Sequence, residues 1–152
     1  MKRRDWQFLR GFVLFSLLAF GLLQLWPRNQ TNPPIVGVPN WDSEQTAELV
    51  YRACYDCHSH ETRWPWYTNI VPVSSLLEHD VAAGREVLNF SDLEAGCCTE
   101  DQIERMAAIV GRDQMPPPYY VLLHPEAQLT SEERGKLIYG LIATMENELN
   151  EE

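Results

Sequence analysis

The chain has few basic residues beyond its first 28 positions. Five of its 12 lysines and arginines lie in that first segment, so residues 29–152 carry 7 basic and 21 acidic side chains, a net charge of −14. A surface with this charge repels nucleic acid and favours basic partners or none. We therefore expect no nucleic-acid binding.

Sustained alternation of apolar and polar residues, the pattern of β-strands, is missing, and so is any internal repeat. Capping-box patterns instead begin helices near Ser75, Thr99 and Thr130, and Gly84 is a plausible helix stop. The 124 residues after position 28 suffice for one compact domain but not for two. The sequence predicts one all-α domain of short helices over residues 41–149.

Charge is also absent from residues 11–26, an apolar run preceded by the basic residues of positions 1–10. As a helix this run covers about 24 Å, slightly less than a hydrocarbon core of about 30 Å. We predict a single-pass transmembrane anchor with residues 1–10 in the cytoplasm. A signal peptide cleaved near Ala19-Phe20-Gly21 is the alternative, which would leave an apolar stretch at the new terminus. Residues 27–40 contain four prolines and are predicted to form a stiff tether.

Residues 54–58 read Cys-Tyr-Asp-Cys-His, the C-x-x-C-H spacing of covalent c-type haem attachment. Cys54 and Cys57 would each form a thioether to a haem vinyl group, and His58 would be the proximal iron ligand. A redox-active dithiol and half of a zinc site also use C-x-x-C, but neither requires the following histidine. The motif favours one covalently bound haem c.

A helix is expected to lead into this motif. Asp42 with Gln45 forms a capping-box pattern, and apolar side chains recur at helical spacing from Ala47 to Cys54. One buried face would therefore run directly into the attachment cysteines.

Met115 is the predicted distal iron ligand. It stands in Gln-Met-Pro-Pro-Pro, where the following proline excludes it from a helix interior and places it on a stiff loop. His79 and His124 are the alternative distal ligands. The choice matters because methionine–histidine ligation gives a higher reduction potential than bis-histidine ligation.

Four separated segments resemble the bacterial haem-binding domain family of small cytochrome c-like proteins. They are residues 54–74, residues 84–91 with Gly-Arg-Glu-Val-Leu-Asn-Phe-Ser, residues 114–119 with Gln-Met-Pro-Pro-Pro-Tyr, and residues 123–127 with Leu-His-Pro-Glu-Ala. The resemblance covers about residues 45–148. It implies a monohaem domain exported to the periplasm, sometimes fused to other cytochrome or peroxidase modules, and it implies no particular physiological reaction.

Several side chains near the motif are candidate haem contacts. An aromatic run could wall the haem edge, with an indole or phenol bonding a propionate, and two arginines are propionate partners by charge. The alternative is that the rings belong to the core and the arginines to the solvated surface. The residues concerned are Trp64, Trp66, Tyr67, Arg63 and Arg85.

Cys97 and Cys98 are adjacent, and their Cα atoms lie about 3.8 Å apart, below the usual disulfide range of roughly 4.4–6.8 Å. A strained vicinal disulfide, two free thiols, an intermolecular link and a zinc site shared with Cys54 and Cys57 are all open interpretations.

Two functions follow from these patterns. The first is a membrane-tethered electron carrier in the bacterial inner membrane, with its haem domain on the periplasmic side and redox proteins as partners. The second is a haem enzyme or sensor, such as a peroxidase-like domain, which requires an open sixth iron position. We expect the electron carrier rather than an enzyme, because no catalytic constellation is recognisable elsewhere in the chain.

Overall fold

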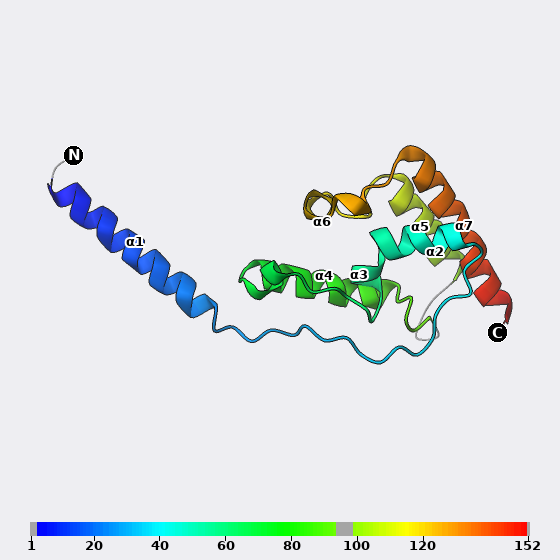
Figure 1. Ribbon diagram of the computed structural model, residues 1–152, viewed down its shortest axis with the longest axis horizontal. Helices are drawn as coiled ribbons and strands as arrows, with labels where there is room; N and C mark the ends of the chain where they lie inside the picture. The colour runs from blue at the N-terminus through cyan, green and yellow to red at the C-terminus, as the bar shows by residue number, and fades with distance from the viewer. Residues whose placement is uncertain (1–2, 94–98, 152) are drawn as a thin grey trace. The chain divides into compact units, whose positions relative to one another are not determined.

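The computed structural model describes residues 3–93 and 99–151. Within these residues every regular element is helical, which confirms the expected all-α class. The elements are α1 Arg3–Leu23, α2 Glu44–Ala53, α3 Tyr55–His58, η1 Trp66–Asn69, α4 Val73–Val87, α5 Glu100–Gly111, α6 Pro118–Leu123, η2 Pro125–Ala127 and α7 Ser131–Glu151 (Figure 1). The chain divides into two compact units, residues 1–30 with 64–79 and residues 31–63 with 80–152.

The first unit contains α1, whose apolar side chains are exposed along its whole length. The 19 residues Asp5–Leu23 are long and apolar enough to cross a membrane. At about 1.5 Å per residue they span roughly 28 Å, close to a hydrocarbon core. Just beyond the helix, Gln24 exchanges two hydrogen bonds with the backbone of Val71, at 3.0 and 3.2 Å. The N-terminal helix is therefore compatible with a single-pass anchor.

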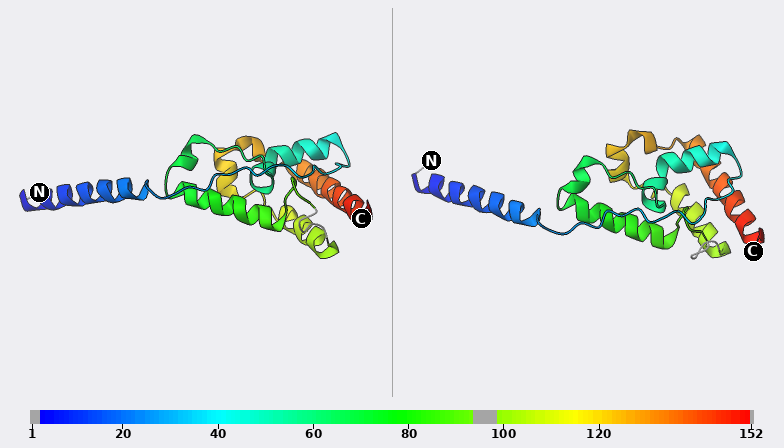
Figure 2. Two further views of the ribbon diagram at one scale, coloured as in Figure 1. Left: turned by 90° about the horizontal axis from the view of Figure 1, so that it is seen from below. Right: turned by 60° about the horizontal axis from the view of Figure 1, so that its bottom comes forward.

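In the second unit α7 packs against both α2 and α5 (Figures 1 and 2). Gly140 permits the close approach of α7 to α2, because a Cβ there would lie 1.9 Å from Oγ1 of Thr46. Apolar side chains from all three helices form the core, together with two from the chain around η2 and with Tyr55 and Phe90. The core residues are Leu49, Val50, Ala53, Tyr55, Phe90, Ile103, Val110, Ala127, Leu129, Leu137, Leu141 and Met145.

The predicted helix starts agree with the structure at two places. Thr99 and Gln102 form the expected capping box of α5, and Thr130 and Glu133 exchange the corresponding bonds at the start of α7. The prediction for α2 was wrong by one residue. Ser43, rather than Asp42, is the N-cap, since its hydroxyl accepts from the backbone N–H of Thr46.

Gly84 does not end a helix, contrary to the sequence prediction, because α4 continues to Val87. The glycine serves a close contact instead. A Cβ at this position would lie 2.5 Å from the carbonyl oxygen of Cys57, so only a residue without a side chain lets α4 lie against the backbone of the C-x-x-C-H segment.

Candidate haem site

The C-x-x-C-H segment forms its own short helical turn after α2. Cys54 ends α2 and also precedes α3, and its carbonyl accepts from the backbone N–H groups of Cys57 at 3.2 Å and His58 at 3.0 Å. This turn brings the two cysteines and the histidine together within five residues of one helical turn. Both thiols are free, and each is partly buried.

His58 is oriented by a backbone carbonyl. Its Nδ1 lies 3.0 Å from the carbonyl oxygen of Leu88, and because a carbonyl oxygen only accepts, Nδ1 must carry the proton. The lone pair of Nε2 is then available to a metal, as is usual for metal-ligating histidines. Burial lowers the pKa of His58, although the carbonyl hydrogen bonds act in the opposite direction. The imidazole is therefore neutral at pH 7, the form that binds iron.

Burial also governs the two thiols. It raises the pKa of Cys54 to about 12, with a contribution from the neighbouring Cys57, and it raises the pKa of Cys57 to about 12, with Asp80 and Asp56 adding to the effect. Zinc binding requires thiolates. Among the described residues no group of three or more His, Cys, Asp or Glu side chains could hold a metal ion. Cys97 and Cys98 lie outside the described residues.

His58 and Cys54 line a cavity of about 390 Å³, hereafter the His58 cavity. This volume falls within the range of roughly 300–1,000 Å³ that small-molecule and cofactor sites occupy. Its walls are mostly apolar, as a porphyrin requires, and come from α5, α7, the end of α4 and the chain that follows it. The apolar lining residues are Val87, Leu88, Phe90, Ile103, Met106, Ile109, Val110, Leu141 and Met145.

Three polar side chains also line the His58 cavity, namely Glu86, Gln102 and Arg105. Arg105 is exposed and forms an ion pair with Asp101 on the same helix face. It is the basic residue of this lining, and a guanidinium suits a propionate carboxylate. Sequence reasoning missed Arg105 and Gln102, although both flank the helical stripe of Ile103, Met106 and Val110 that the pattern marks as inward-facing.

Met115 lines the same cavity as His58 and is 38% exposed. It lies in residues 112–117, the segment between α5 and α6 that we call the Met115 loop. The structure thus brings Cys54, His58 and Met115 to one cavity. The other two candidate ligands are not among the residues that line it. His124 stacks on Tyr120 with ring centroids 4.1 Å apart, and His79 belongs to the first unit, where it is exposed.

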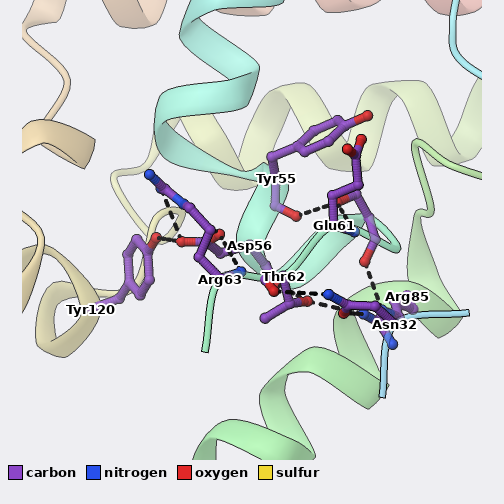
Figure 3. Close-up of polar contacts among 9 residues, drawn as sticks. Asn32, Tyr55, Asp56, Glu61, Thr62, Arg63, Arg85 and Tyr120 are labelled. Atoms are coloured by element: carbon purple, nitrogen blue, oxygen red, sulfur yellow. Dashed lines mark hydrogen bonds and ion pairs between the residues drawn. The ribbon is translucent and has the colours of Figure 1, made fainter. Parts of the chain in front are cut away.

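The predicted propionate partners have other contacts. Arg63 forms an ion pair with Asp56 at 3.1 Å. Arg85 donates to the side chains of Asn32 and Thr62, at 3.0 and 2.9 Å (Figure 3). It also donates to the carbonyls of Ser59 and Thr31, at 2.7 and 2.9 Å. These bonds attach residues 31–32, part of the predicted tether, to the chain that follows the haem motif.

The aromatic candidates belong to the first unit. Trp66 and Tyr67 make an edge-to-face contact with centroids 5.8 Å apart, and Trp66 is 76% exposed. Trp64 has a buried indole nitrogen for which the described residues offer no hydrogen-bond partner. A haem role for these three rings stays a prediction.

The donor set and the apolar lining of the His58 cavity fit a haem group. Comparison with family models agrees, since the model described as "Haem-binding domain" matches residues 18–142. Searches of curated proteins and of solved structures found no match. The match covers most of the chain, and the protein belongs to the haem-binding domain family.

Proposed function

We propose that this protein is a membrane-anchored monohaem c-type cytochrome that carries electrons outside the cytoplasmic membrane of a bacterium. The observation that carries the proposal is the shared cavity, in which Cys54, His58 and Met115 lie together among apolar walls. When bound, the haem supplies an iron centre that gains or loses one electron. A thioether ligand opposite an imidazole favours ferrous iron and so a higher potential than two histidines give.

The residues of the attachment segment have separate tasks in this proposal. Cys54 and Cys57 would hold the haem, each by adding its thiol across one vinyl group, so that a C–S bond would form and the thiol proton would go to the other vinyl carbon. No oxidant is needed and no group leaves. His58 donates from Nδ1 to the Leu88 carbonyl, which would leave Nε2 to bind the iron, and the apolar lining would keep water away from it.

In this proposal the apolar run of residues 11–26, most of which belongs to α1, crosses the inner membrane once. Basic residues at its N-terminal end keep residues 1–10 in the cytoplasm and send the haem domain to the periplasmic side. Redox proteins with basic surfaces are the partners that the net charge of −14 over residues 29–152 favours. Mass spectrometry of the native protein from the membrane fraction should find α1 intact. A soluble periplasmic protein beginning near Leu22 would contradict the anchor.

Covalent attachment is tested by producing the full chain together with a cytochrome c maturation system. We expect haem-linked peroxidase staining that survives denaturing electrophoresis and one haem per chain by pyridine haemochrome assay. A colourless protein that holds one zinc ion per chain would contradict the proposal.

A further inference from the structure

Asp56 lies between the two cysteines of the attachment motif and is only 8% exposed. Its carboxylate accepts four hydrogen bonds. Oδ1 accepts from the backbone N–H and the Nε–H of Arg63, both at 3.1 Å, and Oδ2 accepts from Nη2 of Arg63 at 3.1 Å and from the hydroxyl of Tyr120 at 2.7 Å. Figure 3 shows Arg63 and Tyr120 converging on Asp56. Each oxygen therefore accepts two bonds, and loss of even one hydrogen bond to a charged group is costly.

Tyr120 belongs to the part of the chain that follows the Met115 loop. It lies on α6, five positions after Met115, and residues 116–118 between them are three prolines. Proline fixes φ and removes a hydrogen-bond donor, so this connection has little freedom to absorb movement. The ring of Tyr120 also stacks on His124, which leaves the hydroxyl directed at Asp56. The hydroxyl therefore joins the end of the Met115 loop to the haem-attachment segment.

The other end of the Met115 loop is held from α7. Arg134 donates to the carbonyl of Val110 at 3.0 Å and pairs with Asp113 at 2.5 Å. Asp113 has φ of 60°, in the left-handed region that aspartate tolerates better than most residues. The side chain of Met115 has no hydrogen-bond donor and is partly exposed, so the position of its sulfur depends on how the two ends of the loop are held.

We propose that Asp56 and Tyr120 are positioning residues for the distal iron ligand. Asp56 is covalently next to Cys57 and moves with the haem-attachment segment, whereas Tyr120 moves with the Met115 loop. Their hydrogen bond holds Met115 toward the iron and opposes its replacement by another ligand. The inference rests on the proposed function, in which Met115 is the distal ligand.

The test uses the full-length ferric protein and imidazole as the competing ligand. Tyr120→Phe removes one hydroxyl and keeps the ring that stacks on His124. Loss of a hydrogen bond to a charged group should raise the population with Met115 displaced, and so tighten imidazole binding, by roughly 10-fold or more. Tyr139→Phe, which removes a hydroxyl from a residue that is 75% exposed on α7, is the matched control and should leave the affinity unchanged. Equal affinities for the two variants would overturn the inference.

Variants at Asp56 and Arg63 test whether the effect of Tyr120→Phe comes from its bond to Asp56. Asp56→Ala, which has no side-chain acceptor, should tighten imidazole binding at least as much as Tyr120→Phe does. Adding Tyr120→Phe to it should change the affinity little, because the Tyr120 hydroxyl then has no carboxylate left to bond. Additive effects in the double variant would overturn the pairing. Arg63→Gln, at an exposed partner of Asp56, removes the Arg63 side-chain bonds but leaves the bond from Tyr120 to Asp56 in place. It should therefore tighten imidazole binding less than Tyr120→Phe does, and an equal or larger effect would overturn the pairing.

Met115→Ala distinguishes failure of this inference from failure of the proposed function. If Met115→Ala tightens imidazole binding strongly while Tyr120→Phe does not, the ligand assignment stands and the positioning role is wrong. If Met115→Ala leaves imidazole affinity unchanged, Met115 is not the ligand, and both the assignment and the inference fail.

Discussion

The proximal and distal sides of the His58 cavity are built differently. On the proximal side, residues 54–58 form one local turn, and the backbone fixes the rest through the Leu88 carbonyl and the contact at Gly84. On the distal side, side chains hold the Met115 loop near its two ends, Arg134 at Asp113 and Asp56 at Tyr120. In the proposed function, haem attachment would depend on backbone contacts around residues 54–58, whereas iron ligation would depend on side-chain bonds that hold the Met115 loop.

The largest expected effect comes from removing the proximal attachment itself. Replacing both cysteines, Cys54→Ser with Cys57→Ser, should abolish covalent haem, because a serine hydroxyl is a far weaker nucleophile toward a vinyl group. Haem staining after denaturing electrophoresis measures this directly. Met115→Ala should keep the stain, and a stained double-serine variant would break the distinction between the two sides.

A smaller effect is expected at Gly84. An added Cβ would meet the Cys57 carbonyl at 2.5 Å, so Gly84→Ala should destabilise the domain by about 1–3 kcal/mol through overpacking. Urea unfolding monitored by circular dichroism provides the measurement. Gly135→Ala in α7, where the Cβ meets nothing within 4 Å, is the control and should be neutral or stabilising by about 0.5–1 kcal/mol. Equal effects at the two positions would show that the proximal contact is not tight.

Removal of a single charge from the Met115 loop should lower the free energy of unfolding by less than Gly84→Ala does. Asp113→Asn keeps a residue type that tolerates positive φ but removes the charge that faces Arg134. Because the Asp113 carboxylate is 76% exposed, the loss should be less than about 1 kcal/mol. Urea unfolding measures it, and a loss as large as that of Gly84→Ala would contradict the weaker hold on this side.

The smallest effect is expected where the last turn of α2, just before the C-x-x-C-H segment, meets the first turn of α7. Glu133 accepts from the backbone N–H of Thr130 and from Arg52, and these bonds lower its pKa to about 2 from an ordinary 4.5. A carboxylate with a lowered pKa stabilises the fold above about pH 4.5, and the contribution is lost as the pH falls toward 2. Glu133→Gln should therefore lower the urea midpoint at pH 7 and have no effect near pH 2. A difference that persists at pH 2 would contradict this assignment.

The two sides also differ in how far the sequence predicts them. The C-x-x-C-H spacing, the capping boxes at Thr99 and Thr130 and the all-α class are local patterns, and local patterns can be read along a chain. The role of Gly84 could not be predicted, because a glycine inside a helix and a glycine that ends one look alike in sequence. The contact with the Cys57 carbonyl distinguishes them only in the structure. The bond between Asp56 and Tyr120 joins residues 64 positions apart, and no periodicity marks either one. Neither residue was among the predicted site residues.

The iron's sixth ligand tests the central claim most directly. The measurement is the visible spectrum of the ferric full-length protein, with carbon monoxide binding to the ferrous form, for the unmodified chain and for Met115→Ala. The account predicts the weak long-wavelength band of ferric haem with a thioether ligand in the unmodified protein, and its loss in Met115→Ala together with rapid carbon monoxide binding. Rapid carbon monoxide binding by the unmodified protein, or a Met115→Ala spectrum identical to the parent's, would contradict the account.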